Sequence, residues 1–366
     1  MPWPGYLIIW HPVLEEAMDF WVRKGQAALF LAPMEGVTDA PMRTLLGERG
    51  GFTHLVTEFL RVSQLVPPAR LFLKHMHEIR TGSCTASGHP VILQLLGGNP
   101  ERLAETAALA VANGAKSIDL NFGCPAPTVN SHDGGATLLK HPQRIEMIVR
   151  AVRDALPGHI PVSAKLRLGW DSHDPIHENA RRAEQGGASW IAIHGRTKTQ
   201  GYMPPAHWGP IGRVRAALSI PVIANGDIWT LRDFRACREE TGCEHFMLGR
   251  SALANPHLVH SIARELGLPH RELGETPTAA EWRALLGRFL EISSPLSDNP
   301  FYGLRRVKQW LRYAFQHGSF TGFQQVKRLE SEEALRAILP FLGEPCESSS
   351  AFPRKGLNPQ MIFNQA

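Results

Sequence analysis

The stretch PVILQLLGGNPERLAETAALAVANGAKSIDLNFG, residues 90–123, determines the fold. It contains an apolar strand-like run (90–97), a segment with the apolar spacing of a helix (99–115) and a second strand-like run (117–123). The helix-like segment reaches a glycine near its end, as helices commonly do. Strands that alternate with helices in this way indicate a parallel sheet whose connections are helical.

The same alternation extends in both directions from this stretch. Strand-like runs lie at 28–33, 53–59, 90–97, 117–123, 161–169, 189–196, 220–227 and 244–250. Eight repeats predict an α/β fold of the closed (β/α)8, or TIM barrel, type. An open doubly wound sheet is the alternative, but no G-x-G-x-x-G motif follows the first run.

The pattern changes after the eighth run. Helix-like segments at 277–292, 300–316, 322–329 and 331–342 follow one another with no strand between them, which predicts a small all-helical domain. We therefore divide the chain into an N-terminal extension of unknown role (1–26), a barrel (27–256), a helical domain (257–343) and a disordered tail (344–366). Met18 is an alternative start of the chain.

The composition is that of an ordinary globular enzyme. Of 366 residues, 43% are hydrophobic and 20% charged, and no apolar stretch reaches the roughly 18 residues that a membrane span needs. The first residues lack the features of a secretory signal, and five irregularly spaced cysteines form neither a disulfide framework nor a zinc motif. We expect a cytoplasmic protein with no metal, no membrane association and no obligate protein partner. The net charge of +5 hints only weakly at a polyanionic partner.

Polar residues interrupt the apolar runs where the predicted strands end. Barrel enzymes carry their chemistry at the carboxyl ends of the strands, so these residues are candidates for an active site. They are Gln94, Asn121, Cys124, Lys165, Arg167, His194, Arg196, Asn225, Gly226, Gly249 and Arg250.

Cations and glycines dominate this set. Lys165 and Arg167 are two residues apart and therefore point to the same side of a strand, as do His194 and Arg196. A buried cation needs either a structural carboxylate or an anionic ligand, and either explanation can hold for any one residue. The glycines of ANGD (224–227) and LGR (248–250) resemble a phosphate cradle, although each alone could be a plain turn. Together these residues suggest a phosphorylated cofactor.

A family resemblance is carried by nine motifs in order, from about residue 27 to residue 340. They are APMEGVTD (32–39), TEFLR (57–61), QLLG (94–97), DLNFGCP (119–125), GGATLL (134–139), KLRLGW (165–170), HGRTKTQGY (194–202), ANGDIW (224–229) and MLGRSAL (247–253). The chain resembles the tRNA-dihydrouridine synthases. TEFLR, GYM and YGLRRVKQW resemble most the bacterial C-type subfamily, which reduces uridine 16 in the D-loop of tRNA.

The resemblance implies a flavoenzyme. Members of the family hold FMN at the barrel mouth, reduce it with NADPH and pass a hydride to C6 of the uridine. By resemblance the cofactor-binding residues are Pro33, Met34, Glu35, Gln94, Lys165, His194, Asn225, Gly226, Asp227, Gly249 and Arg250. A cation such as Lys165 would also stabilise the anionic reduced flavin.

Cys124 then becomes the candidate general acid. Hydride arrival at C6 leaves an enolate that needs a proton at C5, and a thiol with a pKa of about 8.5 is protonated near neutral pH. Asn121 would hold the uracil edge, and Arg167 would neutralise the enolate oxygen. The alternative is that Cys124 is only a small buried hydrophobe, as most free cysteines are.

The segment GLRRVKQWLRYAF (303–315) is a candidate RNA surface. Its apolar residues fall on one helical arc, whereas Arg305, Lys308 and Arg312 share another, and Lys327 and Arg328 follow. An ordinary solvated helix face is the alternative. The resemblance implies tRNA contacts by Arg61, Tyr202, Arg306, Lys308, Tyr313 and Lys327.

One loop and two other functions leave alternative interpretations open. His132 and Asp133 stand where relatives often carry small residues, which could alter closure of that loop over the substrate. Besides a tRNA-uridine reductase, the chain could be a flavin barrel acting on a free pyrimidine, like dihydroorotate dehydrogenases. It could also be an RNA-binding barrel that chaperones tRNA without turnover.

Overall fold

The computed structural model describes residues 20–63, 65–296 and 299–342, and it contains a closed barrel. Eight parallel strands pair in chain order, and the eighth closes onto the first. They are β1 (Ala28–Leu31), β2 (His54–Arg61), β3 (Val91–Leu96), β4 (Ile118–Asn121), β5 (Val162–Arg167), β6 (Trp190–His194), β7 (Val222–Asn225) and β8 (His245–Leu248). The predicted (β/α)8 barrel is confirmed, and the open sheet is excluded. The predicted tail (344–366) and residues 1–19 of the predicted extension lie outside the described residues.

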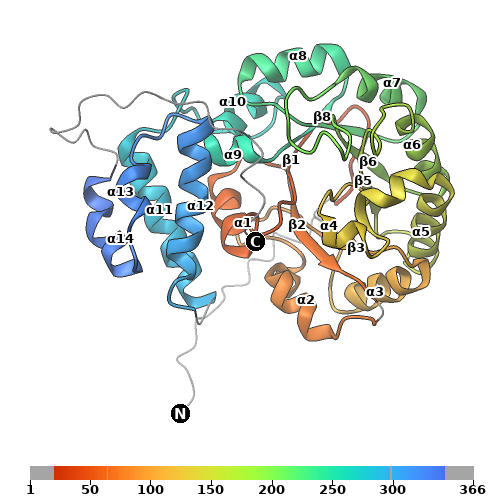
Figure 1. Ribbon diagram of the computed structural model, residues 1–366, viewed down its shortest axis with the longest axis horizontal. Coiled ribbons are helices and arrows are strands. Elements are labelled where there is room, and N and C mark those ends of the chain that lie inside the picture. Colours follow the sequence, from red (N-terminus) through yellow and green to blue (C-terminus); the bar gives the residue numbers. More distant parts are fainter. Residues whose placement is uncertain (1–19, 64, 297–298, 343–366) are drawn as a thin grey trace.

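Helices surround this barrel (Figure 1). The principal ones are α1 (Ala40–Arg49), α2 (Ala69–His75), α3 (Pro100–Ala112), α5 (Pro142–Asp154), α6 (Ile176–Gln185), α7 (Gly209–Ala217), α8 (Leu231–Thr241) and α10 (Leu258–Glu265). Shorter turns are η2 (His77–Thr81), α4 (Pro127–Asn130), η3 (Gly135–Lys140) and α9 (Arg250–Ala254). The start of α3 shows why the sequence folds this way. Asn99 caps it by accepting a 2.7 Å hydrogen bond from the Arg102 amide, and Pro100 occupies the first turn.

Side chains fill the barrel interior. Every second residue of a barrel strand points inward, and these positions are apolar in several strands. The interior cluster consists of Val22, Ala28, Phe30, Ala32, Val56, Ile92, Trp190, Ala192, Ile223 and Met247. A second and larger cluster packs the outer faces of the strands against the helices. Ligands are therefore confined to the ends of the barrel.

A helical domain packs against one side of the barrel (Figure 1). Its elements are α11 (Ala279–Ser293), η4 (Ser294–Leu296), α12 (Tyr302–His317), α13 (Phe323–Lys327), α14 (Glu332–Ile338) and η5 (Leu339–Phe341). In its core Trp282 and Trp310 lie 5.6 Å apart between ring centroids, and α12 packs against α9 while α11 packs against α1. The Trp310 indole N–H donates a 2.9 Å hydrogen bond to the Leu253 carbonyl of α9. The two parts thus share a buried, hydrogen-bonded interface. None of the helices in the described ranges is long and apolar enough to cross a bilayer.

Candidate active site

Strand register brings the predicted polar residues together at one mouth of the barrel. Asn121 at the end of β4 lies beside Lys165 of β5, and Arg167 lies beside His194 of β6. His194 in turn lies beside Asn225 of β7. Residues that are about one hundred positions apart in the chain are therefore neighbours at the carboxyl ends of adjacent strands.

A chain of buried hydrogen bonds connects β5, β4 and β3 beneath this mouth. The Ser163 hydroxyl donates to Asp119 Oδ1 at 2.6 Å, and Gln94 Nε2 donates to Asp119 Oδ2 at 2.6 Å. Asn121 Nδ2 then donates to Gln94 Oε1 at 2.8 Å. Sequence reasoning missed Asp119 and Ser163. The available signal was that Asp119, two residues before Asn121, points to the same side of β4.

This row of hydrogen bonds ends on the backbone of Cys124. Asn121 Oδ1 accepts hydrogen bonds of 2.9 Å from both the Gly123 and the Cys124 amide N–H groups. The Cys124 carbonyl accepts a 3.0 Å bond from the Ala136 amide. Hydrogen bonds therefore hold both the amide N–H and the carbonyl oxygen of Cys124.

Gln94 and Asn121 are largely committed within the protein. Each carboxamide oxygen accepts protein hydrogen bonds, and one of the two N–H groups on each nitrogen is also used. One N–H on each remains for a ligand. The predicted contacts of Gln94 with a flavin and of Asn121 with uracil remain predictions, while their positioning of Cys124 is a structural finding.

The Cys124 thiol suits a proton donor. The residue is half-buried, and burial raises the pKa of its thiol above the usual value. The thiol is therefore protonated at neutral pH, as a general acid must be. Gly135 has a φ of 59°, and a Cβ there would lie 2.9 Å from the Cys124 carbonyl oxygen, so the loop can close only with glycine.

Two cations at the mouth have no ion pair in the described part of the chain. Lys165 Nζ donates a 3.4 Å hydrogen bond to Asn225 Oδ1, and burial together with the Arg167 charge lowers the pKa of Lys165 to about 8. Arg167 is 3% exposed and donates to the backbone carbonyls of Gly123 at 2.9 Å, Thr197 at 3.0 Å and Gly201 at 2.8 Å, and its side chain also meets Tyr202. Arg196 differs, because it pairs with the Asp227 carboxylate. The structural-carboxylate alternative therefore holds for Arg196, whereas Lys165 and Arg167 fit an anionic or electron-rich ligand.

His194 adds a buried nitrogen without a partner. Its Nδ1 makes no hydrogen bond to any described residue, and burial holds the pKa of the imidazole well below its usual value. Such a group costs free energy unless a ligand or water satisfies it. A neutral imidazole beside two cations therefore fits a bound ring with polar edges.

The ends of β7 and β8 form the rest of the mouth. Gly226 has a φ of 121°, and a Cβ there would crowd Ala206 at 3.1 Å. A Cβ on Gly249 would lie 3.3 Å from Met34 Sδ, so the end of β8 adjoins the loop after β1 that carries Pro33, Met34 and Glu35. The Arg250 guanidinium lies 4.9 Å from the Tyr202 ring centroid. The structure therefore brings together the two segments of the predicted phosphate cradle (224–227 and 248–250), although the Asp227 carboxylate is already engaged by Arg196 and by the Ala206 amide.

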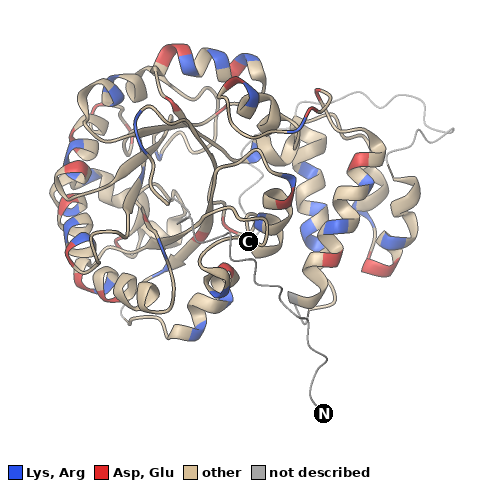
Figure 2. Cartoon of the chain, turned by 180° about the vertical axis from the view of Figure 1, so that it is seen from behind, with Lys and Arg blue, Asp and Glu red and all other residues tan. Residues whose placement is uncertain are grey.

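The predicted RNA-binding residues differ in exposure. Arg61 and Lys327 are exposed, and Tyr202, Lys308 and Tyr313 are half-buried. Lys308 donates to the Leu329 carbonyl. Figure 2 shows Lys and Arg on the helical domain as well as around the outer helices of the barrel. Arg306 departs from the expected position, because it is only 8% exposed and pairs with Asp39 of the barrel.

Asp133 connects the loop after Cys124 to the rim of the barrel through hydrogen bonds. Asp133 accepts hydrogen bonds of 2.7 and 2.6 Å from the two Arg144 Nη atoms and has a φ of 58°. Arg144 also donates to the Gly98 carbonyl at 2.8 Å. A cavity of about 460 Å³ lies here, bordered by Arg61, His132, Asp133 and Arg144 among others. Asp133 therefore anchors the loop at this rim.

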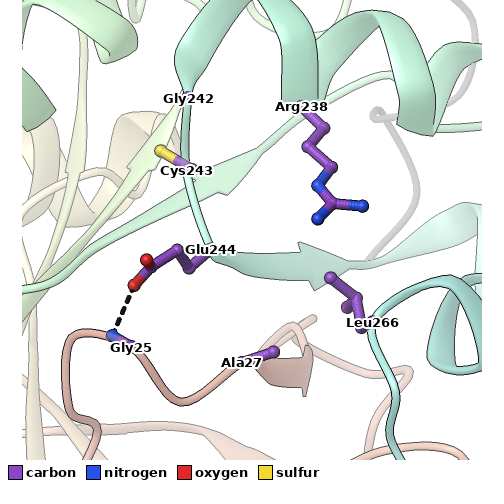
Figure 3. Close-up of a pocket in the computed structure, with 7 residues that line it drawn as sticks. All are labelled: Gly25, Ala27, Arg238, Gly242, Cys243, Glu244 and Leu266. Atoms are coloured by element: carbon purple, nitrogen blue, oxygen red, sulfur yellow. Dashed lines mark hydrogen bonds between the residues drawn. The ribbon is translucent and has the colours of Figure 1, made fainter.

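A second cavity lies at the opposite end of the barrel (Figure 3). It has a volume of about 350 Å³ and is lined by Gly25, Ala27, Arg238, Gly242, Cys243, Glu244 and Leu266. Ala27 precedes β1 and Glu244 precedes β8, so this cavity faces the amino ends of the strands. Barrel enzymes do not use this end for chemistry. No group of three or more His, Cys, Asp or Glu among the described residues is arranged to hold a metal ion.

Comparisons with known proteins agree on one family. A family model described as "Dihydrouridine synthase (Dus)" matches residues 30–340. The tRNA-dihydrouridine(16) synthase of Neisseria meningitidis serogroup A is 41% identical over 320 residues, which cover 86% of this chain and 95% of that protein. The protein of the same name from Pseudomonas putida is 46% identical over 283 residues, covering 77% and 86%.

Solved structures add the fold alone. A complex of 2-naphthoyl-CoA reductase with 2-naphthoyl-CoA aligns with a TM-score of 0.51 and 12% sequence identity. The alignment covers 66% of this chain and 50% of that chain. At this identity the likeness supports a common barrel and carries no inference about the ligand.

Proposed function

The chain belongs to the dihydrouridine synthase family, and we propose that it reduces uridine 16 in the D-loop of tRNA to 5,6-dihydrouridine. Relatives with 40% to 46% identity carry the name tRNA-dihydrouridine(16) synthase, which supports both the RNA substrate and the position. As a member of a family of oxidoreductases, the chain is an enzyme, so the interpretation as a tRNA chaperone without turnover is set aside. The free-pyrimidine reductase is set aside because the relatives are named for action on tRNA.

The observation that carries the proposal is the setting of Cys124. Its thiol has a raised pKa, and a hydrogen-bonded chain from Asp119 through Gln94 and Asn121 fixes its backbone. Saturation of the uracil C5=C6 bond requires one proton at C5. A protonated thiol held rigidly at the barrel mouth can supply it.

The residues at the mouth fit FMN as the cofactor. The unpartnered Nδ1 of His194, the cations Lys165 and Arg250, and the glycines at the ends of β7 and β8 match a ring with polar edges and a phosphate. When bound and reduced by NADPH, FMN would supply the hydride that adds to C6. Pro33, Met34, Glu35, Gln94, Asn225 and Asp227 complete the proposed cofactor-binding set.

The chain's own groups then control charge and protons. As charge builds on the uracil O4–C4–C5 unit, the buried guanidinium of Arg167 would stabilise it in a low-dielectric site. Cys124 would donate its proton to C5 and later recover one from solvent. Asn121 would orient the base while it continues to hold the Cys124 amide.

The substrate uridine must leave its stack to reach this mouth. The helical domain contacts the segment after β1 at this mouth through Arg306 and Asp39, and its exposed cations would hold the tRNA backbone while the base turns out. Arg61 and Tyr202 at the rim, with Lys308, Tyr313 and Lys327 on the helical domain, are the proposed contacts.

Site-resolved mapping tests this function. Purified protein with FMN and NADPH is incubated with tRNA that lacks the modification, and dihydrouridine is mapped at each D-loop position. We expect reduction at position 16. Reduction at another position would refute the choice of target, and no reduction with any tRNA would refute the proposed activity.

A further inference from the structure

A single buried carboxylate lies at the inner end of the row of hydrogen bonds beneath the mouth. Asp119 of β4 lies opposite Gln94 of β3 in the sheet and is 5% exposed. One of its oxygens accepts from the Ser163 hydroxyl and the other from Gln94 Nε2, both at 2.6 Å. An ionised carboxylate can only accept hydrogen bonds, so it determines which end of a neighbouring carboxamide faces it.

The neighbours of Asp119 favour its ionised form. Burial raises the pKa of Asp119, whereas the hydrogen bonds from Ser163 and Gln94 and the positive charge of Lys165 act against this rise. Each carboxylate oxygen has a short hydrogen bond from a donor, as an ionised group requires. A buried carboxylate that is satisfied in this way is a fixed acceptor.

The direction of the whole row follows from this acceptor. Because Gln94 turns its nitrogen to Asp119, its oxygen faces Asn121 and accepts from Asn121 Nδ2 at 2.8 Å. Asn121 then turns its own oxygen to the Cys124 amide, 2.9 Å away. A half-turn of the Gln94 carboxamide would bring its oxygen against the Asp119 carboxylate and its nitrogen against the Asn121 nitrogen. Neither contact would be a hydrogen bond, so the row has one direction.

The two carboxamides in this row are those proposed for the two rings, Gln94 for the flavin and Asn121 for uracil. They are hydrogen-bonded to each other, so a change in the orientation of one affects the other. The N–H that remains on each can meet only a ring atom that accepts a hydrogen bond, such as a carbonyl oxygen. The barrel holds the Gln94 backbone separately, because its amide donates to Thr57 Oγ1 at 3.0 Å. The contact with Asp119 therefore acts on the Gln94 side chain.

We infer that Asp119 is a positioning residue that orients the Gln94 and Asn121 carboxamides, so that both present an N–H to the bound rings. The same orientation lets the Asn121 oxygen hold the Cys124 amide. The inference rests on the proposed function for the identity of the two rings. The orientation itself does not, because the row of hydrogen bonds is formed by the protein alone.

The first test asks whether an acceptor at this position is sufficient. Asp119→Asn keeps an oxygen for Gln94 and can turn its nitrogen to the Ser163 hydroxyl, whereas Asp119→Leu offers no acceptor. Ser163→Ala is the matched control, because it removes the other hydrogen bond of Asp119 and leaves the bond to Gln94. Single-turnover reduction of unmodified tRNA by flavin-loaded, full-length protein should slow about 10- to 100-fold in Asp119→Leu, but less than about threefold in Asp119→Asn and Ser163→Ala.

Two outcomes of this assay would overturn the inference. Equal losses in Asp119→Asn and Asp119→Leu would show that the charge of Asp119 matters and that the orientation does not. A normal rate in Asp119→Leu would show that the carboxamides need no acceptor at this position. The Kd for tRNA, measured in parallel, should change by less than about twofold in every variant, because phosphate contacts provide most of the affinity.

Hydrogen exchange gives a readout that needs neither flavin nor tRNA. Asn121 accepts from the amides of Gly123 and Cys124. In the apo-protein these two amides should exchange about five- to tenfold faster in Asp119→Leu than in wild type, and at nearly the wild-type rate in Asp119→Asn and Ser163→Ala. The amides of α6 serve as the reference for overall opening. An equal increase in α6 would overturn the inference, because the substitution would then only lower the stability of the whole domain.

Gln94→Met interrupts the row at its next member and keeps the exchange test decisive if Asp119→Leu does not fold. It should give the same faster exchange of the Gly123 and Cys124 amides. Faster exchange combined with a wild type that reduces no tRNA would support the positioning role and refute the proposed function. Unchanged exchange in Gln94→Met would refute the positioning role, whatever the wild type reduces.

Discussion

The barrel mouth and the helical domain both gather cations, and they hold them in different ways. Lys165 and Arg167 are enclosed at the mouth with no ion pair in the described structure, so their charges act in a poorly screened environment. Arg305 and Lys327 of the helical domain are exposed, and salt screens such charges within about 10 Å. The difference teaches that the mouth is built for chemistry on one bound group, whereas the helical domain is built for contact with an extended polyanion.

The strongest way to test this division is to remove the proton donor at the mouth. Cys124→Ala should lower the turnover of dihydrouridine formation by roughly 10²–10⁴-fold, the usual contribution of a positioned general acid. FMN binding and tRNA binding should stay near wild type, because neither is assigned to the thiol. Single-turnover assays with FMN-loaded protein measure the first effect, and titrations measure the others. Near-normal turnover would mean that water or another group protonates C5.

Lys165 tests whether a mouth cation acts on the cofactor. Lys165→Met should weaken FMN binding by about 10- to 100-fold, because a hydrogen bond to a charged group contributes about 1.5 to 3 kcal/mol. The tRNA salt slope should not change. Unaltered FMN affinity would remove Lys165 from the cofactor site.

The pH dependence sharpens the same assignment. Burial and Arg167 lower the pKa of Lys165 to about 8, so the ammonium is charged below that pH and loses its charge above it. The affinity of wild-type apo-protein for FMN should therefore fall as pH rises through about 8. Lys165→Met should show no such step. A step that persists in the variant would have to come from another group.

A substitution in the helical domain should affect tRNA binding and leave FMN binding unchanged. Charge reversal in Lys327→Glu should weaken tRNA binding severalfold at low salt and progressively less as salt is raised. FMN affinity and reduction by NADPH should remain normal, because Lys327 is exposed on α13 and is assigned no contact with the cofactor. Binding curves at several salt concentrations measure this. A change in FMN affinity would contradict the division between the two regions.

Periodicity made the architecture predictable, whereas the strand-end position and the family resemblance singled out Cys124, whose role as proton donor stays a prediction. The eight runs and the four helical segments after them correspond to β1–β8 and to α11–α14, with boundaries shifted by a few residues. Cys124 stood out because a cysteine at the end of a buried strand follows Asn121 by three residues. The structure adds the reason for that spacing, since the Asn121 oxygen caps the Cys124 amide.

Side-chain contacts between different helices and strands could not be predicted from the sequence. A periodic pattern shows which residues share a face of a helix, but it does not show which element packs against that face. Arg306 illustrates this limit. Tyr302, Arg306, Gln309 and Tyr313 are spaced by three or four residues, so they form a polar stripe on α12 beside its apolar arc. Such a stripe fits an RNA surface and a domain interface equally well. Only the position of Asp39 shows that Arg306 belongs to the interface.

Asp133 provides the smallest expected effect, and it tests whether an exposed ion pair at the mouth behaves like the enclosed cations or like the helical domain. The Asp133 side chain is 59% exposed and pairs with Arg144, which is 34% exposed. Exposed pairs contribute about 0 to 1 kcal/mol, so Asp133→Asn should change KM for tRNA by less than about fivefold and leave kcat nearly unaltered. Asparagine is the right replacement because it tolerates the φ of 58° at this position, whereas alanine would add backbone strain. The effect should shrink further at high salt. A large loss of kcat that persists at high salt would instead show that the Asp133–Arg144 pair holds the Cys124 loop in its catalytic shape. This ion pair would then act on catalysis, as Lys165 and Arg167 do, and not on tRNA binding.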